Sequence, residues 1–139
     1  PCHNFAFGER EGRVAVAPVT DAYYQQGSLR NGTGETIEVR TVDNFCSAEN
    51  IEFVDIFKTD TEGYEIEVLR GATNMLRERR IKYIIAEATL MSPKHTNLFD
   101  LVEYLQPFDF SLFSIFDIHH SVKNGGLKYC NALFKLRNV

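Results

Sequence analysis

Hydrophobic and polar residues alternate in two short stretches of the first third of the chain. Apolar and polar positions alternate over Thr36–Val42, and Arg13–Val19 is rich in valine and alanine. A period of two is typical of a half-buried strand, and Pro18 favours a sheet edge for the earlier stretch. The residues between them, Thr20–Glu35, are mostly Gly, Gln, Asn, Ser and Thr. We therefore predict an antiparallel ribbon with a loop at its tip, preceded by a short strand at His3–Phe7.

The next part of the chain predicts a strand followed by a helix. An apolar strand at Phe53–Lys58 leads into a turn at Thr59–Gly63, in which Asp60 or Thr61 would be the N-cap of the helix. Glutamates begin the helical stretch and arginines end it, which fits the helix dipole. Spacings of three and four residues, typical of a helix, connect Glu65, Val68, Leu69, Ala72, Met75 and Leu76.

The last third predicts one more strand and helix, then a hairpin. Lys82–Ala88 is an apolar strand, and Leu98–Leu105 is an amphipathic helix that Pro107 ends. Two strands, Phe110–Ile118 and Leu127–Val139, are joined by a glycine-containing turn. This series of alternating strands and helices predicts an α/β sheet, parallel in the middle and antiparallel at its last edge.

Two carboxylates lie where strands of this sheet end. Asp60 follows the strand at Phe53–Lys58, and Glu87 closes the next strand. Neighbouring strands lie about 4.8 Å apart, so we expect the two side chains to share one crevice. Such a pair can bind a cation, bind a ligand's hydroxyl groups or act as a general base. The structural alternatives are a helix cap for Asp60 and an ion pair with Lys58 for Glu87.

Other candidate residues lie in turns and loops, and each has a structural alternative. Glu62 and Gly63 fit either a ligand-binding turn or a charged helix start with a backbone bend. The remaining candidates fit either ligand contacts or ordinary loop residues, and they are Tyr23, Tyr24, His119 and His120.

Composition narrows the choice of function. Fifteen Lys and Arg against nineteen Asp and Glu give a net charge of −4, which does not favour nucleic acid or an anionic membrane as a partner. No apolar run reaches the roughly 18–20 residues that span a bilayer, so we expect a soluble protein. Three widely spaced cysteines, without a Cys-x-x-Cys pair, favour a reduced, cytoplasmic setting. No glycine-rich phosphate loop links a strand to a helix.

One segment resembles a known family signature. Residues 57–72 include Lys-Thr-Asp-Thr-Glu-Gly-Tyr-Glu followed by Leu-Arg-Gly-Ala. This resembles the signature of the FkbM-type S-adenosylmethionine-dependent methyltransferases, in which Lys-Ile-Asp-Val-Glu-Gly-x-Glu precedes Leu-x-Gly-Ala. The resemblance covers nearly all of the chain, through the segments Asn4–Gly12, Thr36–Phe45, Ile84–Glu87 and Asn131–Phe134.

The resemblance implies a fold, a reaction and site residues. It implies a class I, Rossmann-like methyltransferase sheet with strand order 3-2-1-4-5-7-6, and O-methylation of a sugar or natural-product hydroxyl by S-adenosylmethionine. Asp60 and Glu87 would be catalytic, and Asp60, Glu62 and Gly63 would bind the methyl donor. The acceptor would be a small molecule bound near Tyr23, Tyr24 and His119.

The sequence also departs from the family pattern. The family's first two strands, with the glycine-rich donor loop, are absent, so residues 1–139 are expected to be a single domain that forms the C-terminal portion of a methyltransferase. His3–Phe7 would then have no neighbouring strand, and Phe53–Lys58 would expose an apolar edge. A non-catalytic fragment that forms a homo-oligomer or pairs with a partner chain through this edge is therefore an alternative function. A divalent-metal enzyme using Asp60, Glu87 and His119 or His120 is a third.

Overall fold

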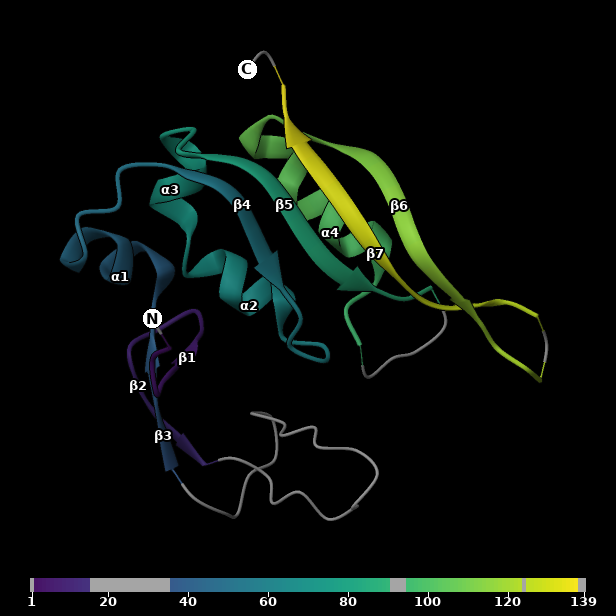
Figure 1. Ribbon diagram of the computed structural model, residues 1–139, viewed down its shortest axis with the longest axis horizontal. Coiled ribbons are helices and arrows are strands. Elements are labelled where there is room, and N and C mark those ends of the chain that lie inside the picture. Colours follow the sequence, from purple (N-terminus) through teal and green to yellow (C-terminus); the bar gives the residue numbers. More distant parts are fainter. Residues whose placement is uncertain (1, 16–35, 91–94, 124, 138–139) are drawn as a thin grey trace.

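The computed structural model contains two mixed β-sheets and four α-helices among the residues it describes, which are 2–15, 36–90, 95–123 and 125–137 (Figure 1). The predicted α/β class is confirmed. In chain order, the elements are β1 (Ala6–Phe7), β2 (Gly12–Ala15), β3 (Thr36–Arg40), α1 (Val42–Ala48), β4 (Val54–Thr59), α2 (Glu65–Arg70), α3 (Thr73–Arg77), β5 (Ile81–Ala88), α4 (Leu98–Leu105), a 3-10 turn (Gln106–Phe108), β6 (Phe110–His120) and β7 (Leu127–Leu136).

The smaller sheet has the strand order β1-β3-β2. β2 and β3 pair antiparallel, with Val14 opposite Ile37, which confirms the predicted ribbon. β1 pairs parallel with β3, with Ala6 opposite Val39, so the expectation that the first strand has no neighbour is wrong. β3 lies between β1 and β2 and forms backbone hydrogen bonds with both, a pairing that the sequence pattern did not predict.

The larger sheet has the strand order β4-β5-β7-β6, and β4 is an edge strand as expected. β4 and β5 pair parallel through the crossover formed by α2 and α3, whereas the β5–β7 and β7–β6 pairs are antiparallel. The final antiparallel hairpin is confirmed. The prediction of a mostly parallel arrangement is wrong, because β7 lies between β5 and β6 and therefore forms two antiparallel pairs.

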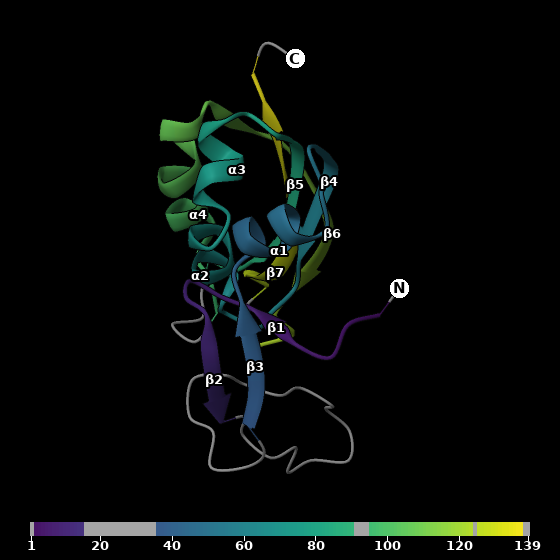
Figure 2. The same cartoon turned by 90° about the vertical axis from the view of Figure 1, so that its left-hand side faces the viewer.

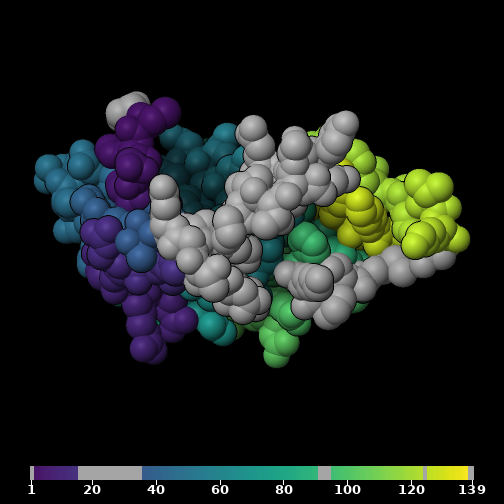
Figure 3. Space-filling view, turned by 90° about the horizontal axis from the view of Figure 1, so that it is seen from below, coloured from purple at the N-terminus to yellow at the C-terminus, as the bar shows by residue number. Residues whose placement is uncertain are grey.

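The helices α2, α3 and α4 cover one face of the larger sheet (Figure 2). Alternate residues of β5, such as Ile84 and Ala86, point into this core and are fully buried, together with Phe134 of β7. The opposite face, which we call the uncovered face, includes Ile56 and Phe113, which are 60% and 63% exposed. Viewed from the side toward which β4 runs, the smaller sheet and the β6–β7 turn lie at opposite ends of the molecule (Figure 3).

The single helix predicted from Glu65 onward is divided into α2 and α3 near Gly71. A Cβ atom at Gly71 would lie 2.1 Å from the carbonyl oxygen of Gly8, so only glycine permits this approach between the helix end and the smaller sheet. Asp43 of α1 accepts hydrogen bonds from the backbone N–H groups of Asn74 and Met75, at 2.9 and 3.0 Å. A residue from a helix that the sequence pattern missed thus caps α3.

None of the helices in the described part of the chain is long and apolar enough to cross a membrane.

Candidate functional site

The candidate site lies where the parallel strands β4 and β5 end. The last paired residues of β4 and β5 are Thr59 and Ala86, so Asp60 and Glu87 follow directly on adjacent strands. The carboxylate of Asp60 is close enough to that of Glu87 to affect its ionisation. The structure thus brings these two predicted residues to the same end of the sheet. Their assignment as catalytic residues remains a prediction.

Asp60 forms an ion pair with Lys58, in which Nζ and Oδ2 are 2.7 Å apart. Both side chains are exposed, so this pair contributes little to stability. The N-cap position of α2 is occupied by Tyr64, without a side-chain hydrogen bond, so capping by Asp60 or Thr61 is wrong. The expected ion pair between Glu87 and Lys58 is also absent among the described residues, because Lys58 contacts Asp60 instead.

The carboxyl group of Glu87 has a raised pKa. Burial raises the pKa of Glu87 to about 7, and the negative charges of Glu62, Asp60 and Glu65 act in the same direction. The positive charge of Lys58 opposes them with a smaller effect. A carboxyl group with a pKa near neutrality can both accept and release a proton at physiological pH, which is a property of general acid–base residues.

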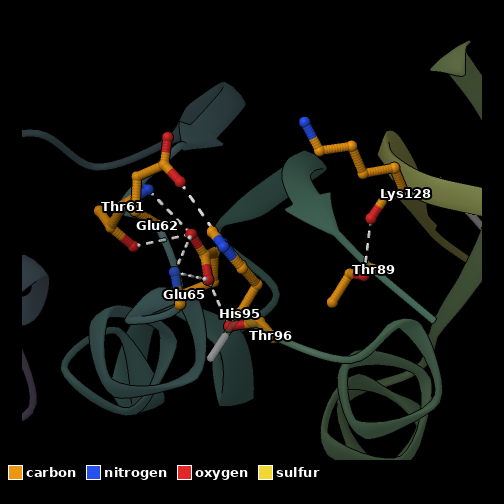
Figure 4. Close-up of polar contacts among 8 residues, drawn as sticks. Thr61, Glu62, Glu65, Thr89, His95, Thr96 and Lys128 are labelled. Atoms are coloured by element: carbon orange, nitrogen blue, oxygen red, sulfur yellow. Dashed lines mark hydrogen bonds and ion pairs between the residues drawn. The ribbon is translucent and has the colours of Figure 1, made fainter. Parts of the chain in front are cut away.

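A second carboxylate, that of Glu65, fixes the loops around the site (Figure 4). Glu65 is 1% exposed and accepts hydrogen bonds from the Thr61 backbone N–H and hydroxyl, at 2.8 and 3.0 Å. It also accepts one from the Gly63 N–H at 3.1 Å and one from the Thr96 hydroxyl. These bonds connect the turn after β4 to the segment before α4 and offset the cost of burying the charge.

The turn after β4 directs Glu62 toward a histidine. Glu62 and Gly63 have φ angles of 55° and 101°, so two consecutive residues adopt left-handed conformations. The Glu62 carboxylate oxygen Oε2 lies 3.4 Å from His95 Nδ1, and the side chains point toward each other in Figure 4. Gly63 therefore provides the bend, and its N–H contacts Glu65.

His95 was not among the residues predicted from the sequence. It lies in the connection between β5 and α4, next to two backbone hydrogen bonds that close this connection, Thr89 N–H to Thr96 O and Leu98 N–H to Thr89 O. One ligand atom each from Glu62, Glu87 and His95 lie within 4.8 Å of one another. No local sequence pattern marks His95 as a site residue. Only the folded structure shows that it lies close to Glu62 and Glu87.

The predicted acceptor-binding residues do not join this group within the described residues. The ring of His119 stacks on Tyr129, with centroids 4.3 Å apart, and His120 Nδ1 lies 3.1 Å from the carbonyl oxygen of Gly125. The expected contribution of either histidine to a metal site with Glu87 is not observed. Tyr23 and Tyr24 lie outside the described residues.

Comparison with known proteins gives a family. No curated protein and no solved structure matches the sequence significantly. A family model described as the methyltransferase FkbM domain matches residues 8–112, which include β2 and β3 of the smaller sheet, β4 and β5 of the larger sheet and the whole turn after β4. Because this match spans well over half of the sequence, the chain belongs to the FkbM methyltransferase domain family.

Proposed function

We propose that the protein is an S-adenosylmethionine-dependent methyltransferase that methylates a hydroxyl group of a sugar or natural product. The family match supports methyl transfer. The observation that carries the proposal is the meeting of Asp60 and Glu87 at the ends of adjacent parallel strands, where ligands bind in open α/β sheets. The order β4-β5-β7-β6 is also the order implied for the last four strands of a class I, Rossmann-like methyltransferase sheet.

The residues at the site fit the charge of the methyl donor. The donor carries a positively charged sulfur and an amino group, and Asp60 and Glu62 offer carboxylates that attract both. Gly63 would contribute the backbone bend that orients Glu62 toward the donor. The N–H of Gly63 is not available to the donor, because it is hydrogen-bonded to Glu65. When bound, the donor supplies an electrophilic methyl group.

Glu87 is the residue proposed to act on the acceptor. It lies beside Glu62 and Asp60, and its pKa of about 7 suits a group that takes the proton from an acceptor hydroxyl. Proton removal raises the nucleophilicity of the hydroxyl oxygen. Tyr23, Tyr24 and His119 are proposed to contact the acceptor, with His119 located on the long β6–β7 hairpin that extends past the end of β5.

The proposal includes the setting and the partners of the protein. Within the described residues, Cys46 and Cys130 are buried thiols and Cys2 is an exposed one, which fits a reduced, cytoplasmic compartment. The net charge of −4 fits a small-molecule acceptor better than nucleic acid or a membrane surface. The edge strand β4 carries exposed apolar residues such as Ile56, so a homo-oligomer through this sheet edge is proposed as well.

Methyl transfer from labelled S-adenosylmethionine to a panel of sugars and hydroxylated natural products tests this function. The wild type is expected to label at least one acceptor, and Glu87→Gln is expected to lower kcat by about 10²–10⁴-fold. Glu103→Gln, an exposed glutamate on α4, is the matched control and should retain the wild-type rate. Equal rates for wild type and Glu87→Gln would show that Glu87 does not act on the acceptor.

A further inference from the structure

We propose that Glu62, Glu87 and His95 form a binding site for a divalent first-row transition-metal cation. The three residues come from three different segments: the turn after β4, the end of β5 and the connection to α4. The inference goes beyond the proposed function, because cation binding requires neither a methyl donor nor an acceptor.

The distances within the group match those of metal ligands. One oxygen or nitrogen from each residue lies within 4.8 Å of the other two. Glu62 Oε2 and His95 Nδ1 are 3.4 Å apart, which is the separation of about 3.4 Å expected for two ligands in tetrahedral coordination with bonds of about 2.1 Å. Glu87 supplies the third ligand atom of the group, within 4.8 Å of the other two.

The charge around the site favours a cation. Glu62, Asp60 and Glu65 all disfavour the ionised form of Glu87, whereas the nearby Lys58 forms its ion pair with Asp60. Glu87 itself has no hydrogen bond or ion pair within the described parts of the chain. A divalent cation between Glu62 and Glu87 would offset their mutual repulsion.

The imidazole of His95 determines which cations fit. Calcium and magnesium prefer sites made of oxygen ligands, whereas imidazole suits zinc, iron, nickel and copper, and carboxylates suit manganese. Two carboxylates and one imidazole thus favour manganese or zinc over magnesium. Glu62 is 25% exposed and His95 39% exposed, so a cation can enter from solvent.

The loops that carry two of the ligands are held by the same buried carboxylate. Glu65 contacts Thr61 and Gly63 on either side of Glu62, and it contacts Thr96, the residue after His95. Such supporting hydrogen bonds orient metal ligands in advance of binding. Glu62 and Glu87 would then be shared between the cation and the roles proposed for them above, whereas Asp60 is not among the three ligands.

Titration of the chelator-treated protein with Mn²⁺, followed by the electron paramagnetic resonance signal of free Mn²⁺, tests the proposal. We expect one saturable site per chain. His95→Gln, Glu62→Gln and Glu87→Gln should each weaken binding by at least about tenfold. The matched controls His120→Gln and Glu103→Gln alter exposed residues outside the group and should bind as the wild type does.

Two results would overturn the proposal: no saturable binding by the wild type, or unchanged binding by folded His95→Gln. Glu87→Gln removes a repelled negative charge and no hydrogen bond within the described residues, so this variant is expected to fold. Circular dichroism of each variant confirms the fold before titration. Because the assay contains no donor or acceptor, its failure would leave the methyltransferase proposal standing, and a lack of methyl transfer would not affect the metal result.

Discussion

At the scale of single residues, protonation of Glu87 makes the stability of the fold depend on pH. Its pKa is about 7 in the folded protein, against an ordinary value of 4.5, because of burial and the charges of Glu62, Asp60 and Glu65, with Lys58 opposing. The folded state therefore holds a proton that the unfolded state releases between these two values. Stability is predicted to decrease as the pH rises through this window, since the unfolded state then binds fewer protons.

Substitution of Glu87 by glutamine should abolish this loss of stability. In chelator-treated protein, Glu87→Gln is expected to raise the melting temperature at pH 8, where the wild-type carboxyl is charged, and to change it little at pH 5. Because the Glu87 side chain is partly exposed, solvent screens its charge, and we expect a stabilisation of only about 1 kcal/mol at pH 8. This corresponds to about 3 °C in melting temperature for a chain of this size. Thermal denaturation at both pH values provides the measurement. Equal stabilisation at pH 5 and pH 8 would refute the raised pKa.

At the scale of elements, the family signature serves two purposes. Part of it builds the fold: Glu65 fixes the turn after β4, and Gly71 permits the close contact with Gly8. Another part, Asp60 and Glu62, follows the end of β4 and contacts Lys58 and His95 there. A motif match alone does not separate these purposes, whereas burial and hydrogen bonding do.

The contact between Gly71 and Gly8 gives a prediction about packing. Gly71→Ala should destabilise the protein by about 3 kcal/mol or more, because the added Cβ would lie 2.1 Å from a backbone carbonyl oxygen that can move only with its sheet. Gly12→Ala is the matched control, since a Cβ atom there meets nothing within 4 Å. Urea denaturation measures both variants. Similar stabilities for the two would contradict the requirement for glycine at the contact between Gly71 and Gly8.

The sequence predicts the elements whose pattern repeats locally. Apolar residues at strand or helix spacing predicted β4, β5, α4 and β7. The spacing is regular because each of these elements buries one side against the same core. The helix α1 was missed: it has only seven residues, and its Asp43 acts on the distant helix α3. Asp60 and Glu87 were predicted from the ends of strands, whereas His95 depends on how a connection folds back toward Glu62. Contacts between distant segments leave no periodic signal in the sequence.

At the scale of the whole molecule, the larger sheet is covered on one side only by the described elements (Figure 2). The uncovered face and the adjoining edge of β4 carry exposed apolar residues, among them Ile56 and Phe113. We expect concentration-dependent self-association, and Ile56→Lys should shift the protein toward the monomer by placing a charge at this edge. Size-exclusion chromatography with light scattering measures the effect. A wild type that is monomeric at all concentrations would refute association through this face.

The central claim, that the ends of β4 and β5 form a methyl-donor site, is most directly tested by isothermal titration with S-adenosylhomocysteine. This compound lacks the transferable methyl group and reports on binding alone. We predict binding in the micromolar range that Asp60→Asn weakens by at least about tenfold, whereas Asp55→Asn, which alters an exposed aspartate on β4, leaves it unchanged. Absence of binding by the folded chain, or equal binding by Asp60→Asn, would contradict the claim.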